Sequence, residues 1–273
     1  MSEKRVSGLF VYPIKSLGGI AMAEVEVGIR GFKNDRRWML VDPDGTFLSQ
    51  RTYPKMALLK PELTGDQLTI HCLDQPIEPL KIPAAPPTYA ETLHVSVWDS
   101  QCQAVCIGKE QDEWFSTALN TACRLVYMPD TVIRPINPKY ARQQEYVSFA
   151  DGYPYLIIGE AALADLNGRL EQRVPMDRFR PNIVYRGGKP YEEDHWQTFR
   201  MGALTFRGIK PCPRCQITTI DQKTAVTGKE PLKTLAKYRR QNNEVCFGLN
   251  ACWVANKKME NVIRVGDEIV VMG

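Results

Sequence analysis

Hydrophobic and polar residues alternate with a period of two over many short stretches of this chain, which is the pattern of half-buried β-strands. The stretches that predict strands are 6–12, 23–28, 37–41, 68–72 and 93–98. The sequence Pro43-Asp44-Gly45 is a turn signal, and it predicts a further strand directly after it. The closing stretch 262–272 is interrupted by Gly266 and Asp267, which predicts a C-terminal hairpin.

Three stretches predict helices: an apolar stripe at 111–119, strong helix formers at 159–170, and 230–240, which begins near Pro231 and ends in basic residues. Prolines gather around 77–88, where we expect a loop or an edge crossing rather than a central strand. Many short strands with separate helices favour an α+β, predominantly β, barrel-like fold over a doubly wound sheet. No G-x-G-x-x-G motif follows a strand, which weighs against a dinucleotide-binding fold.

The composition is that of a globular protein. The 273 residues are 44% hydrophobic and 24% charged, enough for a sizeable core in one large domain or two smaller ones. A net charge of +4 is too small to predict a nucleic-acid partner, although it allows a local basic patch for a small anion. No stretch approaches the ~18 apolar residues of a membrane span. No apolar signal core follows Met1, so we expect a cytoplasmic protein without a membrane partner.

Residues 211–215, Pro-Cys-Pro-Arg-Cys, are the stretch with the most evident chemistry. The two prolines stiffen the backbone, and Arg214 beside Cys215 favours a thiolate, which is both a nucleophile and a metal ligand. The run that follows predicts a strand with Cys215 at its start. Cys212 and Cys215 form the only C-x-x-C among eight cysteines, and no second tight pair completes a zinc site. The residues alone leave zinc, redox and nucleophilic roles open.

Three further polar clusters lie next to predicted strand ends. Residues 12–16, Tyr-Pro-Ile-Lys-Ser, precede two glycines and could hold a phosphate by charge, hydroxyl and backbone N–H groups. Residues 34–38, Asn-Asp-Arg-Arg-Trp, with Gln50-Arg51 downstream, offer planar guanidinium forks for a phosphate or a heterocycle edge. The third cluster joins 149–154, Phe-Ala-Asp-Gly-Tyr-Pro, with 179–183, Phe-Arg-Pro-Asn-Ile. A solvated turn lysine explains the first cluster at least as well, and a charged turn with Trp38 in the core explains the second equally well. The third cluster favours a polar ligand edge over an open surface. Each signal is modest by itself, so the order of the clusters carries the information.

That order resembles the MOSC-domain family over essentially the whole chain, and within it the bacterial YcbX-type proteins and the mitochondrial amidoxime-reducing component. The motifs that carry the resemblance are Tyr12-Pro-Ile-Lys-Ser16, Asp35-Arg36, Phe149-Ala-Asp-Gly-Tyr-Pro154, Phe179-Arg-Pro-Asn182, Pro211-Cys-Pro-Arg-Cys215 and Glu230-Pro-Leu-Lys-Thr-Leu235. The resemblance implies an N-terminal MOSC β-barrel-like domain at 1–122 and a MOSC β-barrel domain with flanking helices at 123–273. The N-terminal strands would be able to complete the second barrel.

The resemblance also implies a molybdenum enzyme that detoxifies N-hydroxylated compounds, such as hydroxylamino-purines and amidoximes, by two-electron N–O cleavage. Its cofactor would be molybdenum–molybdopterin, and a soft thiolate ligand suits such a metal. The implied residues are Cys215 as metal ligand and catalytic residue, Asp151 and Asn182 as catalytic residues, and Lys15, Ser16, Arg36, Arg180 and Arg214 as cofactor-binding residues.

The sequence departs from the family pattern at two places. Pro213 stands where relatives often have serine, which removes a hydroxyl and a backbone N–H near the metal. YcbX-type chains often continue into a ferredoxin-like domain, whereas this sequence ends at Gly273, so we expect an external electron donor that is ferredoxin-like or a flavin reductase. MOSC domains also occur fused to molybdenum-cofactor sulfurases. A cofactor carrier, or a sulfur-transfer protein with a persulfide on Cys215 or Cys212, is therefore the alternative.

Overall fold

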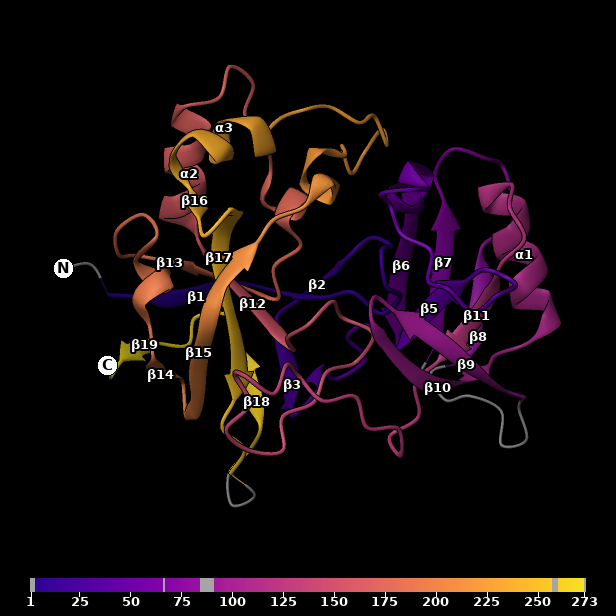
Figure 1. Ribbon diagram of the computed structural model, residues 1–273, viewed down its shortest axis with the longest axis horizontal. Helices are drawn as coiled ribbons and strands as arrows, with labels where there is room; N and C mark the ends of the chain where they lie inside the picture. Colours follow the sequence, from indigo (N-terminus) through magenta and orange to yellow (C-terminus); the bar gives the residue numbers. More distant parts are fainter. Residues whose placement is uncertain (1–2, 66, 84–90, 257–259, 273) are drawn as a thin grey trace.

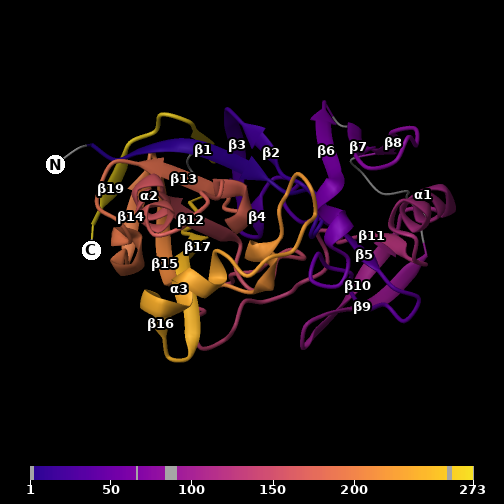
Figure 2. The ribbon, with the colours of Figure 1, turned by 90° about the horizontal axis from the view of Figure 1, so that it is seen from above.

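The computed structural model describes residues 3–65, 67–83, 91–256 and 260–272. Two lobes lie side by side (Figure 1), and the view from above separates the same two lobes (Figure 2). Strands dominate both lobes, which confirms the predominantly β, α+β fold. No helix within the described ranges is long and apolar enough to cross a membrane.

The larger lobe is built on one long sheet. Its strands run in the order β19 (Ile269–Val271), β14 (Thr198–Met201), β15 (Leu204–Pro213), β17 (Glu244–Trp253), β12 (Tyr155–Gly159), β13 (Ile183–Arg186), β1 (Arg5–Val11) and β2 (Ile20–Met22), and β16 (Arg240–Gln241) pairs with β17. The first strand in this order, β19, also approaches β1, because Val6 N donates to Asp267 O at 2.9 Å and Ile269 N donates to Lys4 O at 2.8 Å. The strands therefore close around a core.

Aromatic side chains fill the centre of this barrel. Phe206 meets the ring of Tyr155 edge-on at 5.4 Å and stacks on Phe199 at 5.9 Å. Offset and edge-on arrangements of this kind are the favoured ones for aromatic pairs. A small sheet of β18 (Val262–Arg264), β3 (Glu24–Gly28) and β4 (Gly31–Phe32) covers this core with its own apolar residues.

Within the described residues, the smaller lobe has two sheets, one α-helix and a short 3₁₀ helix, Pro54–Leu58. The first sheet runs β5 (Trp38–Val41), β11 (Arg124–Tyr127), β10 (Ser100–Cys106) and β9 (Thr92–Val97), and the second runs β6 (Leu59–Thr64), β7 (Gln67–Cys72) and β8 (Leu80–Pro83). Helix α1 (Lys109–Leu119) buries Phe115 against this lobe's core. Each lobe takes strands from both sides of residue 122, since β1 belongs to the barrel and β11 to the smaller lobe. The division of the sequence into 1–122 and 123–273 stays a prediction.

Most predicted elements are present. The helices predicted at 111–119, 159–170 and 230–240 correspond to α1, α2 (Glu160–Gly168) and the shorter α3 (Leu232–Tyr238). Within the proline-rich stretch 77–88, β8 is an edge strand, as expected, and residues 84–88 lie outside the described residues. After the turn at 43–45, Thr46 and Phe47 form only isolated bridges rather than a full strand.

Two local predictions are wrong. The C-terminal stretch is not a hairpin, because β18 pairs with β3 and β19 pairs with β14, while the residues between them bond to β1. The stretch after Cys215 is a 3₁₀ turn, Gln216–Thr219, so the thiol follows the end of β15 instead of beginning a strand. Here the hydroxyls of Thr218 and Thr219 donate to backbone carbonyls three residues back, at 3.0 and 2.8 Å. Such local bonds compete with strand pairing.

Candidate active site

A cavity of about 410 Å³ lies between the two lobes. All eight residues that the sequence predicts as site residues line it: Lys15, Ser16, Arg36, Asp151, Arg180, Asn182, Arg214 and Cys215. They come from five segments that are far apart in the chain, which the fold brings together. Their individual roles stay predictions, but their common location is a structural fact.

Three of these residues have a left-handed backbone, which is uncommon outside glycine. The φ angles are +68° at Ser16, +48° at Arg36 and +54° at Arg180. Non-glycine residues in this region are strained, and such residues cluster at binding and catalytic sites because the surrounding structure must hold them there. Here the three strained residues all have polar side chains, and all three line the same cavity.

The ring of Tyr12 contacts two guanidinium groups. The Cζ atom of Arg36 is 4.2 Å from the ring centroid, and that of Arg180 is 4.3 Å away. Arg36 has a carboxylate partner, since its Nη1 donates to Asp35 Oδ2 at 2.6 Å. Arg180 donates to Leu17 O at 2.6 Å, and no ion pair joins it to an acidic residue in the described part of the chain. The charge of Arg36 is therefore neutralised by Asp35, and that of Arg180 has no such partner among the described residues.

Burial makes the charge of Arg180 costly. The side chain is 9% exposed, and burial lowers the pKa of its guanidinium to about 10. A buried charge without a partner is unfavourable unless a counter-ion or a ligand compensates it. Arg180 is consequently the group in this cavity best suited to hold a ligand anion.

Asn182 ties this region to the barrel. Its Oδ1 accepts from Arg36 Nη1 at 3.1 Å and from Leu156 N at 3.3 Å, and its Nδ2 donates to Phe10 O at 3.3 Å. With only 2% of its surface exposed, the amide is occupied by protein groups. The observed contacts orient Arg36, and the predicted catalytic role of Asn182 stays a prediction.

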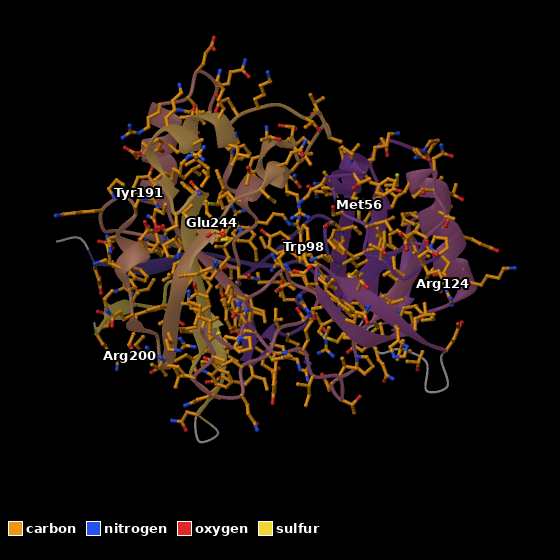
Figure 3. All side chains as sticks on the ribbon, in the orientation of Figure 1. Met56, Trp98, Arg124, Tyr191, Arg200 and Glu244 are labelled. Atoms are coloured by element: carbon orange, nitrogen blue, oxygen red, sulfur yellow. The ribbon has the colours of Figure 1, made fainter. Side chains whose placement is uncertain are left out.

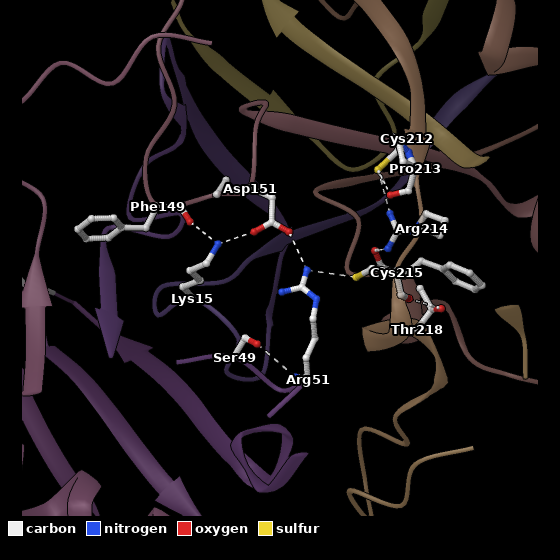
Figure 4. Close-up of polar contacts among 12 residues, drawn as sticks. Lys15, Ser49, Arg51, Phe149, Asp151, Cys212, Pro213, Arg214, Cys215 and Thr218 are labelled. Atoms are coloured by element: carbon white, nitrogen blue, oxygen red, sulfur yellow. Dashed lines mark hydrogen bonds and ion pairs between the residues drawn. The ribbon is translucent and has the colours of Figure 1, made fainter. Parts of the chain in front are cut away.

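A line of polar contacts crosses the cavity from Lys15 to Cys215 (Figure 4). Lys15 Nζ donates to Phe149 O at 2.8 Å and to the Asp151 carboxylate. Burial lowers the pKa of Lys15 to about 8, even though Asp151 opposes that shift. Burial would raise the pKa of Asp151, but the charges of Lys15 and then Arg51 hold it well below its usual range. Asp151 is thus a fixed anion beside a lysine that titrates near neutral pH.

Arg51 completes this line from the smaller lobe. Its Nη2 lies 3.4 Å from Asp151 Oδ2 and 3.2 Å from Cys215 Sγ, and its Cζ lies 4.4 Å from the centroid of Trp98. The predicted site residues do not include Arg51, although its position near the arginine cluster at 34–38 was a signal. Trp98 and Lys210 also line the cavity, and no motif in the sequence indicated them.

The predicted pairing of Arg214 with Cys215 is wrong. Arg214 Nη1 donates to Cys212 Sγ at 3.2 Å, and Nη2 donates to Phe179 O at 2.7 Å. In extended backbone, residues two apart share a face while neighbours point to opposite faces. Arg214 therefore meets the sulfur of Cys212, and Cys215 turns toward Arg51.

The lining of the cavity fits an anionic ligand that carries a soft metal. Its cationic side chains are Lys15, Arg36, Arg51, Arg180, Lys210 and Arg214, against Asp151 as its acidic one. Such an excess of positive charge favours phosphate, and the half-buried sulfur of Cys215 is a soft ligand. Within the described residues, this cavity included, no three His, Cys, Asp or Glu side chains gather as a metal site.

Fold and site together define a two-lobed β protein with a cationic cavity and a cysteine sulfur in its wall. The chain belongs to the MOSC family: the MOSC N-terminal beta barrel domain matches residues 3–122, and the MOSC domain matches residues 144–270. This agrees with the family that the sequence motifs indicated.

Curated relatives support the same assignment. The chain is 33% identical to mitochondrial amidoxime-reducing component 1 of Mus musculus, over 98% of this chain and 82% of that protein. It is 35% identical to mitochondrial amidoxime reducing component 2 of Rattus norvegicus, over 86% of this chain and 72% of that protein. It is also 31% identical to molybdenum cofactor sulfurase of Arabidopsis thaliana, over 97% of this chain but only 35% of that protein.

Proposed function

We propose that this protein is a molybdenum-cofactor-dependent reductase of N-hydroxylated compounds such as amidoximes and hydroxylamino-purines. The observation that carries the proposal is the convergence of Cys215 with an excess of cationic side chains, including the unpaired Arg180, on one cavity. The similarity to amidoxime-reducing components over nearly the whole chain supports it. A cytoplasmic location and an external electron donor, ferredoxin-like or a flavin reductase, belong to the same proposal.

The cavity residues divide into those for the cofactor's phosphate and those for its metal. Arg180, Arg36 and Ser16 line the cavity and would hold the phosphate, while Lys15 adds positive charge. Cys215 would ligate the metal through its sulfur. When bound, the cofactor supplies the two-electron redox chemistry, and the protein supplies binding, orientation and protons.

The reaction needs protons as well as electrons. An amidoxime plus two electrons and two protons gives an amidine and water, with the N–O bond broken. Lys15, with a pKa of about 8, releases a proton near neutral pH more readily than an ordinary lysine. Asp151 holds the Lys15 ammonium in the cavity, and Arg51 links Asp151 to the sulfur of Cys215. We assign Lys15 and Asp151 to proton delivery on this basis.

The proposal is tested by assaying cofactor-loaded protein with benzamidoxime and a chemical electron donor, with benzamidine as the measured product. We expect turnover in the wild type and none in Cys215→Ala, which should remain folded because Cys215 is only half-buried. Wild-type protein that contains molybdenum and reduces neither amidoximes nor hydroxylamino-purines would contradict the proposal.

Sulfur transfer is the second candidate. Two observations favour it: the guanidinium of Arg214 beside the sulfur of Cys212, and the similarity to a region of a molybdenum cofactor sulfurase. The discriminating measurement is mass spectrometry of the intact protein after incubation with a persulfide donor. A +32 Da adduct that a thiol reductant removes, as it removes a persulfide but not a sulfinic acid, and that peptide mapping places on Cys212 or Cys215, would favour this candidate if the metal-loaded protein also reduces no N-hydroxylated compound.

A further inference from the structure

Trp98 is unusual among the tryptophans of this chain, because about half of it is exposed. Its exposed fraction is 49%, and it is the one aromatic side chain among the exposed large apolar residues of the described ranges. Of those exposed apolar residues, Trp98 alone lines the cavity that also contains Cys215. Figure 3 places it between the two lobes. An exposed indole at this position can contact a ligand in the cavity.

The backbone at Trp98 is strained. Trp98 and Asp99 form the two-residue connection between β9 and β10, whose flanking residues Val97 and Ser100 pair directly. The φ angle of Trp98 is +56°, a value for which glycine is the usual residue in such turns. A bulky aromatic residue in this conformation is a clear outlier, and strain of this kind persists where it serves a site.

Neighbouring side chains hold the indole while leaving part of it free. The guanidinium of Arg51 lies 4.4 Å from its ring centroid, and the ring of Phe47 meets it edge-on at 5.1 Å. Arg51 also contacts the sulfur of Cys215 at 3.2 Å. One guanidinium group therefore links the indole to the predicted metal ligand, and both residues line the same cavity.

We propose that Trp98 is the substrate-binding platform of this cavity and selects planar, π-delocalised N-hydroxylated compounds over small aliphatic ones. Aryl amidoximes and N-hydroxylated heteroaromatic bases are the chemical classes that it favours, because any flat π system can stack on an indole. The identity of the reacting N–OH group rests on the proposed function. The selection for a planar substrate rests on Trp98 itself.

Binding without turnover tests the platform directly. Isothermal titration calorimetry of the cofactor-loaded protein, in the absence of reductant, would compare benzamidoxime with acetamidoxime, which share one head group. We expect the wild type to bind benzamidoxime about tenfold more tightly, the effect of one stacking contact. In Trp98→Gly the two affinities should become similar. This variant should still fold, because glycine readily adopts the positive φ at this position.

Two further variants serve as controls. Trp98→Phe retains a flat ring and should keep most of the preference for benzamidoxime. Leu73→Gly removes another exposed apolar side chain, which lies in the same lobe but outside the cavity, and should leave both affinities unchanged. A tenfold preference that persists in Trp98→Gly overturns the proposal.

Steady-state kinetics separate this proposal from the proposed function. If benzamidoxime binds through Trp98 but is never reduced, the reductase function fails and the platform stands. If wild type and Trp98→Gly reduce benzamidoxime with the same KM, the platform fails and the reductase function stands.

Discussion

The segment 211–215 holds two cysteines, and the sulfur of each contacts an arginine in different surroundings. Cys215 meets Arg51, which comes from the other lobe, 164 residues earlier, and which also contacts Asp151 and Trp98. Cys212 meets Arg214 from its own loop, which is otherwise bonded to a backbone carbonyl. The first pair belongs to a charged network that crosses the cavity, and the second packs against an apolar cluster of the barrel lobe. Similar pairs of residues thus acquire different chemistry from their long-range neighbours.

The largest expected effect separates the two cysteines. In Cys215→Ala, amidoxime reduction should fall by more than about 100-fold, since loss of a metal ligand exceeds the effect of losing a residue that only supports one. In Cys212→Ala, it should fall by no more than about twofold. The measurement is product formation at equal molybdenum content, with circular dichroism to check folding. Equal losses in both variants would remove the distinction between the two pairs.

The next effect is a pH dependence of the free energy of unfolding, which arises at Lys15, the end of the polar line opposite Cys215. The pKa of Lys15 is about 8 in the folded protein, below the value of about 10.4 for an unfolded lysine. Between pH 8 and 10 the unfolded chain binds more protons here, so this residue makes the free energy of unfolding rise with pH, by up to about 2 kcal/mol. Below pH 8 this dependence is absent.

Urea denaturation of wild type and Lys15→Met from pH 6 to pH 10 measures this pH dependence of the free energy of unfolding. The difference in free energy of unfolding, wild type minus Lys15→Met, should be constant below pH 8 and should increase above it. A difference that stays flat to pH 10 would show that Lys15 does not titrate in this window.

A smaller effect comes from Arg51, which connects the Cys215 pair to Asp151. Arg51→Met removes the guanidinium beside the sulfur while keeping an unbranched side chain that can pack near Trp98. We expect kcat/KM for amidoxime reduction to fall about tenfold, because the sulfur and the Asp151 carboxylate lose a common anchor. Arg51→Lys should recover part of this loss. Unchanged kinetics in Arg51→Met would mean that the contact in Figure 4 has no role in turnover.

The smallest effect is expected for the other arginine. Arg214→Met removes the bond from Nη2 to Phe179 O, which should lower the free energy of unfolding by about 1 kcal/mol. Its effect on kcat/KM should be smaller than that of Arg51→Met. Denaturant unfolding and the amidoxime assay would be run on the same preparations. A larger loss of kcat/KM in Arg214→Met than in Arg51→Met would contradict the distinction between the two sulfur–arginine pairs.

The sequence predicted those parts of the fold that depend on local patterns. Alternation located strands such as β1 and β7, and helical spacing located α1, because both signals lie within the segment itself. The C-terminal hairpin was wrong because β18 and β19 pair with strands from distant parts of the chain. The strand after Cys215 was wrong because two threonine hydroxyls bond to nearby carbonyls instead.

In the candidate site too, local sequence patterns did not predict the long-range contacts. Ordered motifs were sufficient to place Lys15, Arg36, Arg180 and Cys215 at one cavity. The partner of the Cys215 sulfur was mistaken, because Arg214 is adjacent in sequence while Arg51 arrives from the other lobe. Trp98 was beyond prediction as a site residue, since a tryptophan at a hairpin turn has no sequence signature of binding. Neighbours in space, rather than in the chain, decide these contacts.

Molybdenum K-edge X-ray absorption of the cofactor-loaded protein tests the role of Cys215 most directly. Wild type, Cys215→Ala and Cys212→Ala would be compared at equal metal content, with the number of sulfur ligands as the readout. We predict that Cys215→Ala has one sulfur ligand fewer than the wild type and that Cys212→Ala has the same number. A wild-type sulfur count in Cys215→Ala would contradict the assignment of Cys215 as the metal ligand.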